Sequence, residues 1–161
     1  DKGLLDFGLI IQPADISKYG SVILPNKDTW GIIMNRESEL ASKKAIKRED
    51  LRGKPLIISK QISRRESARG GLLKWLGPDI GRYNIVARYN LLYNASVMAE
   101  KGIGYVVGLD KIVDTSLNSA LCFRPLIPKL ESEMGIIWKK GRLFSTPAKL
   151  FLNKIREYCG E

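Results

Sequence analysis

The strongest helix start in the chain is Ser63-Arg64-Arg65-Glu66, which has the pattern of a capping box. In a capping box, the serine oxygen and the glutamate carboxylate each accept a hydrogen bond from an otherwise unpaired main-chain amide. The free amides and the positive dipole end of such a helix favour an anion, often a carboxylate. Arg64 and Arg65 would each be unfavourable there by about 0.3–1 kcal/mol, and a bound anion would offset this cost. Alternatively, both arginines point into water, eased by Glu66.

The chain offers little for catalysis. It has no histidine, the commonest general base, and Cys122 and Cys159 lack the spacing of a metal site or a catalytic pair. A Gly-x-Ser-x-Gly elbow and a Walker loop are absent, and Gly102-Ile103-Gly104 lacks the third glycine of a dinucleotide-binding motif. No pair of carboxylates stands out among the basic residues. We therefore expect no enzyme activity, no cofactor and no metal site, and we expect both cysteines to be reduced.

The composition suits one ordinary domain or two small lobes, with 161 residues of which 44% are hydrophobic. No apolar run approaches the roughly 20 residues that span a bilayer, so the sequence predicts no transmembrane segment. The net charge is +10, with eleven Lys or Arg against five Asp or Glu between Arg36 and Arg69. Such a segment would suit phosphate groups, but it lacks an aromatic residue for base stacking and a helix-turn-helix or finger pattern. We interpret it as a solvated basic face.

Apolar runs bounded by turn residues predict alternating strands and helices, as in α/β domains. The helix that begins at Ser63 should end near Leu76, because a Gly-Pro pair follows. A terminal helix should begin at Ser145 or Thr146. Strands are expected at 4–11, 21–24, 29–34, 55–58, 85–88, 105–107, 121–123 and 135–138, a turn at 26–28, a short helix at 47–51 and one helical turn at 110–114.

A further helix is predicted after the strand at 85–88. Asn90 is a plausible N-cap for it, and apolar residues then recur at helical spacing. Gly102 stands where a left-handed residue ends a helix, and Tyr105 opens a strand-forming run. A helix that turns so tightly into a strand is typical of α/β domains. These bind small molecules where helix N-termini and strand ends meet.

Segments spread nearly end to end resemble the effector-binding domain of LysR-type transcriptional regulators. Each match is weak alone, and their order and spacing together carry the resemblance. In one departure, Glu37-Ser38-Glu39 replaces the usual histidine-proline pair of the family. The matching segments are LDFGLI (5–10), DTWGII (28–33) followed by Leu40-Ala41, DLRGKPLI (50–57) and AEKGIG (99–104).

The resemblance implies an α/β fold like that of type 2 periplasmic binding proteins, with two lobes joined by crossover strands and an effector between them. It also implies that the first lobe is incomplete, because the early part of that lobe, the winged helix-turn-helix and the linker helix have no counterpart here. Residues 1–12 and 131–161 would be remnants of regulatory subdomain I, and residues 13–130 would be regulatory subdomain II. We expect the remnants to leave exposed apolar surface or an open sheet edge.

The resemblance further implies where the effector lies, near the start of the helix that follows the strand at 56–58. The matching positions are Ser59, Lys60, Gln61, Ile62 and Ser63. Asn90 begins the second helix, whose N-terminus would face the same cleft, although a simple structural cap needs no ligand. The implied hinge residues, for which core packing is the alternative role, are Phe7, Gly8, Gly104 and Tyr105.

The function that the resemblance implies is sensing of a small molecule by a bacterial regulator, without chemistry. The effector would be anionic, and the full-length protein would be a cytoplasmic homo-oligomer, a dimer or tetramer. DNA would be bound only through the missing N-terminal domain, and no membrane would be involved. The alternatives are a solute-binding lobe of a transport system and a basic nucleic-acid-binding domain.

Overall fold

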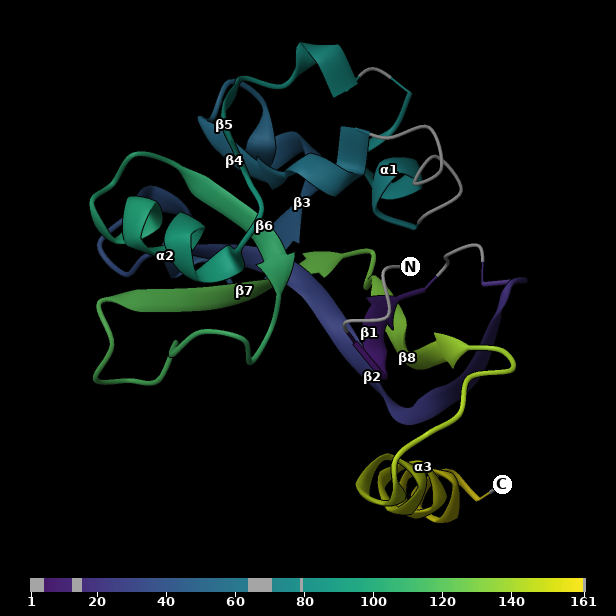
Figure 1. The fold of residues 1–161 in the computed structure, drawn as a ribbon. Helices are drawn as coiled ribbons and strands as arrows, with labels where there is room; N and C mark the ends of the chain where they lie inside the picture. Colours follow the sequence, from purple (N-terminus) through teal and green to yellow (C-terminus); the bar gives the residue numbers. More distant parts are fainter. Residues whose placement is uncertain (1–4, 13–15, 64–70, 79, 161) are drawn as a thin grey trace. The chain divides into compact units, whose positions relative to one another are not determined.

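The computed structural model describes residues 5–12, 16–63, 71–78 and 80–160. The chain forms two compact units (Figure 1). The first comprises Asp1–Lys27 and Ser132–Glu161, and the second comprises Asp28–Glu131. The chain therefore passes between the units at residues 27–28 and 131–132. The first crossing lies later than Gln12, where the sequence places the boundary, because it falls inside a long strand whose first half packs with the first unit.

The second unit is built on a mixed sheet with the strand order β2–β6–β4–β5. β4 runs parallel to both of its neighbours, whereas β2 runs antiparallel to β6. On its other side β2 pairs antiparallel with β7, which also pairs with the short β3. The strands are β2 (Tyr19–Asn35), β3 (Ile46–Lys47), β4 (Leu56–Ser59), β5 (Ile85–Tyr89), β6 (Tyr105–Leu109) and β7 (Leu121–Ile127).

Helices and short 3-10 turns connect these strands. α2 (Leu92–Glu100) packs against β5, β6 and β7, and its buried alanines complete a core cluster with residues of the sheet. Buried strands of this kind are continuous in apolar residues, as β4 is. The other helical elements are η1 (Glu39–Ser42), η2 (Arg48–Leu51), η3 (Lys60–Ser63), α1 (Gly71–Leu76) and η5 (Ile80–Arg82). The cluster comprises Ile33, Ile57, Ala95, Ala99, Val106 and Leu121.

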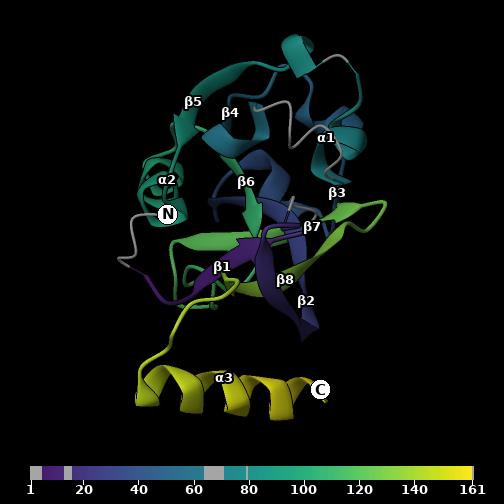
Figure 2. The same ribbon diagram turned by 45° about the vertical axis from the view of Figure 1, so that its right-hand side comes forward.

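The first unit contains a smaller sheet in which β8 (Glu131–Lys139) lies between β1 (Gly8–Ile11) and β2 (Figure 2). α3 (Thr146–Cys159) completes the unit, and the hydroxyl oxygen of its N-cap, Ser145, accepts a hydrogen bond from the Ala148 amide over 3.4 Å. This confirms the predicted start of the terminal helix. A cluster of aromatic side chains packs together in this unit, with the Phe7 ring in contact with the rings of Trp138, Phe144 and Phe151.

Several local predictions are wrong. The turn expected at 26–28 is absent because β2 continues without a break from Tyr19 to Asn35, as one strand that pairs with β8, β6 and β7. The helical turn expected at 110–114 is a tight turn instead, with Lys111 at φ 63°. The N-cap of α2 is Leu91 rather than Asn90, and Leu91 makes no side-chain capping bond.

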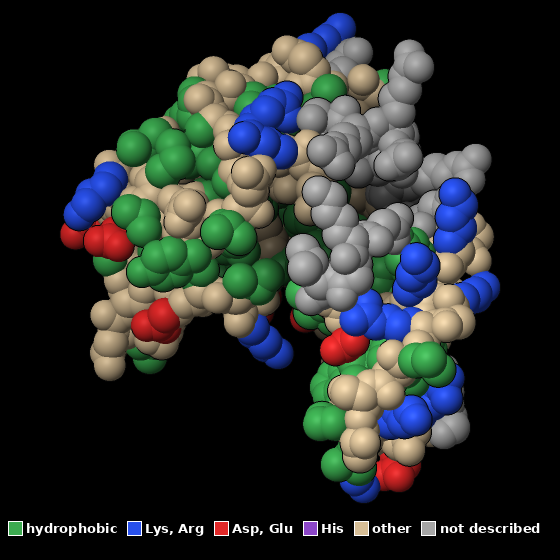
Figure 3. All heavy atoms as spheres, in the orientation of Figure 1, with side chains coloured by type: hydrophobic (Ala, Val, Ile, Leu, Met, Phe, Trp, Pro, Cys, Tyr) green, Lys and Arg blue, Asp and Glu red, His purple; other side chains and the backbone are tan. Residues whose placement is uncertain are grey.

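Apolar side chains are exposed in the first unit, as the sequence predicts. Leu143 is 94% exposed and Leu9, on β1, is 62% exposed. The strand order ends at β1, which pairs with β8. Figure 3 shows hydrophobic side chains on the surface of α3. The exposed apolar residues of this unit, among those described, are Leu5, Leu9, Ile23, Leu143, Leu150, Phe151 and Tyr158.

Candidate functional site

The candidate site begins where β4 ends. Ser59 is the last residue of β4 and is half-buried, and the next residues, Lys60 and Gln61, are exposed in η3. The main-chain amide of Gln61 donates a hydrogen bond to the Ser59 hydroxyl oxygen over 3.2 Å. The side chain of the last strand residue thus forms a hydrogen bond with the main chain of the 3-10 turn that follows.

Strand register brings the second predicted site residue to the same edge of the sheet. Ser59 is paired in register with Tyr89, the last residue of β5, and Asn90 follows directly. Asn90 is exposed and precedes α2. Because β4, β5 and β6 are parallel, their carboxyl ends share one edge, which is where open α/β sheets bind ligands. The structure therefore brings Ser59, Lys60, Gln61 and Asn90 together.

Tyr89, at the end of β5, stabilises this edge, and the sequence did not predict it as a site residue. Its hydroxyl group donates a hydrogen bond of 2.8 Å to the Val107 carbonyl oxygen, which links β5 to β6. Burial raises the pKa of the Tyr89 hydroxyl well above its ordinary value, so the group stays protonated as a donor. Its position as the last residue of β5, directly before Asn90, identifies it as a site neighbour only once the strand register is known.

The predicted capping box at 63–66 lies mostly outside the described residues. Ser63 is the last residue of the 3-10 helix η3, and the α-helix that the structure describes begins at Gly71. Ile62 also lies in η3. Arg64, Arg65 and Glu66 lie outside the described residues. Within the described residues, the anion-binding argument applies to the 3-10 turn after β4.

The predicted hinge residues pack inside the units. Phe7 is stacked on Phe144 with ring centroids 5.1 Å apart, and Gly8 is paired in register with Ile137 of β8. Tyr105 donates its amide to the Pro55 carbonyl over 2.8 Å. A Cβ atom at Gly104 would lie 2.7 Å from the same oxygen, so glycine is required by this close approach. None of the four stands at residues 27–28 or 131–132, where the chain passes between the units.

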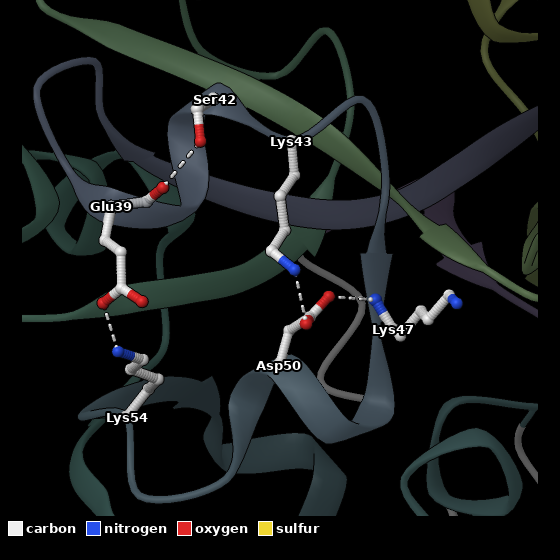
Figure 4. Close-up of polar contacts among 6 residues, drawn as sticks. All are labelled: Glu39, Ser42, Lys43, Lys47, Asp50 and Lys54. Carbon is white, nitrogen blue, oxygen red and sulfur yellow. Dashed lines mark hydrogen bonds and ion pairs between the residues drawn. The ribbon is translucent and has the colours of Figure 1, made fainter.

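The basic segment that begins at Arg36 is partly neutralised by its own acidic residues. Figure 4 shows Asp50 between Lys43 and Lys47: it accepts bonds from the Lys43 ammonium group over 2.7 Å and from the Lys47 amide over 2.9 Å. These hydrogen bonds, that of Lys43 foremost, lower the pKa of the Asp50 carboxyl. Lys54 is paired with Glu39 in the same view.

Arginine side chains of the same segment serve the fold. The Arg36 guanidinium donates to four main-chain carbonyls in the loop before β7 and at the first residue of β7, among them Ser116 over 2.6 Å and Leu121 over 2.9 Å. The Arg48 guanidinium lies 6.0 Å from the ring centre of Trp75. These contacts fit the interpretation of a solvated face with structural roles rather than a continuous phosphate-binding surface.

Groups suited to metal binding are not gathered anywhere in the described part of the chain, which holds no cluster of three His, Cys, Asp or Glu side chains. Cys122 is buried and Cys159 is half-buried, and both are free thiols, as predicted. No helix within the described ranges is both long and apolar enough to cross a membrane.

The family model described as the LysR substrate binding domain matches residues 1–160. The chain belongs to this family. Its fold is that of the type 2 periplasmic binding proteins, a mixed α/β sheet with helices, as found in the regulatory domains of LysR proteins. No curated protein matches the sequence.

Solved structures of LysR proteins share the fold at low sequence identity. HinK, a LysR family regulator from Pseudomonas aeruginosa, is 16% identical with a TM-score of 0.71, over 95% of this chain and 53% of HinK. The C-terminal domain of a probable LysR regulator from Rhodococcus sp. RHA1 is 15% identical with a TM-score of 0.71, over 94% and 74%. The CcmR regulatory domain from Synechocystis PCC6803, in complex with 2-PG, is 16% identical with a TM-score of 0.70, over 96% and 73%. The chain thus spans about half of HinK and about three quarters of the separate regulatory domains.

Proposed function

We propose that this chain is the small-molecule sensing domain of a bacterial LysR-type transcriptional regulator. Membership of the LysR substrate binding domain family supports the proposal. The observation that carries it is the shared carboxyl edge of β4 and β5, where Ser59 and Tyr89 are in register and Asn90 follows. A ligand at this edge meets the 3-10 turn after β4 and the loop before α2.

The proposed effector is a small anion. Lys60 is exposed at this edge and supplies a positive charge. CcmR, which has this fold, is in complex with 2-PG. By analogy of position, the effector-binding residues would be Ser59, Lys60, Gln61, Ile62, Ser63 and Asn90.

In the proposed mechanism, binding changes the relation between two regulatory subdomains without a chemical reaction. The second unit would correspond to regulatory subdomain II, and the first unit to part of subdomain I. DNA would be bound only through a domain outside this chain, in a cytoplasmic protein. Neither a transport function nor direct nucleic-acid binding is favoured by any contact of the described residues.

A homo-oligomer of the full-length protein is also proposed. Apolar side chains gather on the surface of α2 (Figure 3). Tyr93 is 70% exposed and Val97 is 44% exposed, one turn apart on the same face. Exposed apolar groups of this kind are typical of protein–protein contacts.

The decisive experiment is a calorimetric titration of the protein with 2-PG and with inorganic phosphate. Lys60→Ala and Ser63→Ala should each weaken binding, with Lys60→Ala having the larger effect because it removes a charge-assisted contact. Lys44→Ala is the matched control, since Lys44 is an exposed lysine of the same basic segment, distant in sequence from the site. Unchanged affinity in both site variants would reject the proposed site.

A further inference from the structure

The three parallel strands at the candidate site do not pair over the same length. β4 pairs with β5 up to Ser59 and Tyr89, the last residue of each strand. The pairing of β4 with β6 ends earlier, at Ile57 and Val106. Both strands, which the structure describes in full, continue beyond this last pair, β4 to Ser59 and β6 to Leu109. β4 and β6 therefore stop pairing before the carboxyl edge that they share.

The end of this pairing is also the point at which the chain connections diverge. The strand that follows β4 in the chain is β5, on one side of β4. The strand that follows β6 is β7, which pairs with β2 on the other side. Open α/β sheets bind ligands beyond the carboxyl ends of strands whose connections leave in opposite directions. A ligand of the proposed site is therefore expected outside the ends of β4 and β6.

Ser59 and Tyr89 lie on the face of the sheet against which α2 packs. The Tyr89 side chain packs against the core cluster, to which α2 contributes Ala95 and Ala99. Ser59 follows Ile57, a member of that cluster, by two residues, and side chains two residues apart on a strand share a face. The two side chains thus lie on one face, at the edge expected to bind the ligand.

The Tyr89 side chain crosses the end of β4 on this face. Its hydroxyl group donates a hydrogen bond of 2.8 Å to the Val107 carbonyl oxygen, one residue beyond the last pair of β4 with β6. Because β4 lies between β5 and β6, the ring has to pass over β4 close to Ser59 to make this bond. Tyr89 is half-buried, so part of it is accessible to solvent. The bond takes up the single proton of the hydroxyl group and holds the ring across the end of β4.

We propose that Tyr89 is a specificity-determining residue, which sets the size limit of the effector site. A small anion binds at Lys60 without moving the ring. A larger group attached to the anion has to displace the ring, and this displacement breaks the hydrogen bond to Val107. The inference rests on the proposed sensing function and deepens it, because it restricts the effector to small anions.

A thiol at the end of β4 measures access to this edge without any ligand. Ser59→Cys introduces the thiol where the Tyr89 ring crosses β4. The reagents are N-methylmaleimide and N-phenylmaleimide, which share the reactive group and differ in size. Mass spectrometry of the peptides separates the reaction of this thiol from those of Cys122 and Cys159. The ratio of the two rates reports how strongly size restricts access.

We expect Tyr89→Phe to raise the rate with N-phenylmaleimide roughly fivefold relative to N-methylmaleimide, because moving the ring no longer breaks a hydrogen bond. Tyr89→Ala removes the ring and should raise this ratio further. If Tyr89→Ala does not fold, Tyr89→Phe decides alone, because it keeps the ring that packs against the core cluster.

Tyr83→Phe is the matched control for these variants. The Tyr83 hydroxyl also donates to a main-chain carbonyl, that of Leu76 over 2.9 Å, but Tyr83 precedes β5 and so lies at the opposite edge of the sheet. Tyr83→Phe should leave the ratio of rates unchanged. An unchanged ratio in Tyr89→Phe, or an equal rise in Tyr83→Phe, would overturn the proposal.

A second arm separates this inference from the proposed function. Inorganic phosphate and phenyl phosphate share the charged group and differ by a ring. Calorimetry should show that Tyr89→Phe raises the affinity for phenyl phosphate roughly fivefold relative to inorganic phosphate. An unchanged ratio of the two affinities would also overturn the size limit. If neither anion binds, the result counts against the proposed function, and the maleimide rates still decide whether Tyr89 restricts access.

Discussion

The hydroxyl oxygen of Ser59 accepts a hydrogen bond from the main-chain amide of Gln61 over 3.2 Å. This bond orients the peptide that follows β4, at the edge where Asn90 leaves β5. The turn after β4 is therefore preorganised by a side chain of the strand itself. Preorganised polar groups bind a ligand with less loss of conformational freedom.

Replacing Ser59 should weaken anion binding more than it weakens the fold. We expect Ser59→Ala to lower the affinity for 2-PG by about fivefold, the effect of one hydrogen bond, with the thermal midpoint nearly unchanged. Ser42→Ala is the matched control, because the Ser42 hydroxyl donates to Glu39 over 3.0 Å in another exposed 3-10 turn. Titration calorimetry and thermal unfolding measure both effects, and equal affinity losses in the two variants would contradict the prediction.

Gly102 should be required for its backbone angle alone. It ends α2 at φ 72°, and an added Cβ would meet no atom within 4 Å. We expect Gly102→Ala to lower the free energy of unfolding by about 1 kcal/mol through backbone strain. Gly81→Ala is the control, since a Cβ at Gly81 also meets nothing within 4 Å, and the left-handed strain does not apply there. Urea unfolding of both variants checks this, and equal changes would refute the argument.

Elements specified by neighbouring residues were predictable from the sequence. β4, β5 and β6 lie close to where the apolar runs place them, and Gly102 and Ser145 act at helix ends as expected. These signals depend on residues within a few positions of one another. The family resemblance extended this local information to the overall fold, which the match over residues 1–160 confirms.

Features that depend on distant pairing were not predictable. The Asn26-Lys27-Asp28 sequence favours a turn, but these residues lie inside β2, one long strand that pairs with β8, β6 and β7. The register of Ser59 with Tyr89 depends on how two strands meet, and their sequences contain no signal for it. Asn90 entered the predicted site as the first residue of the second helix, whereas the N-cap of that helix is Leu91.

The ion pair of Asp50 should make stability depend on pH in the acid range. Its carboxyl accepts bonds from Lys43 and the Lys47 amide, which lower its pKa below the ordinary 3.8. A lowered folded-state pKa contributes stability above the unfolded pKa, and that contribution is lost as the pH falls through the folded value. Asp50→Asn should therefore cost up to about 1 kcal/mol at pH 7, and the difference from wild type should shrink below pH 3.8.

The control for this pH dependence is Glu49→Gln in the same 3-10 turn. It removes the same charge from an exposed position beside Asp50. Chemical unfolding between pH 2 and neutral pH, scanned in roughly unit steps, compares both variants with wild type. A difference between Asp50→Asn and wild type that persists undiminished in acid would show that the ion pair is not its source.

The two units should differ in local stability, and the chain contains a matched pair of sequences to show it. Leu-Ile-Ile occurs in β1, as residues 9–11, and in β4, as residues 56–58. The three residues of the copy in β4 are each at most 1% exposed, and β4 lies between two parallel strands. Leu9, in the β1 copy, is 62% exposed on a strand at the end of the strand order. Few buried apolar contacts and an open edge lower the free energy of local opening.

Amides of the β1 copy should accordingly exchange at least about tenfold faster than the corresponding amides of the β4 copy. Because the two tripeptides are identical, their intrinsic exchange rates are closely similar, and the difference reports structure. Residue-resolved hydrogen exchange at neutral pH measures both copies in one sample. Equal protection would contradict the prediction. It would mean that the exposed apolar side chains of the first unit, Leu143 and Leu150 among them, are covered in solution.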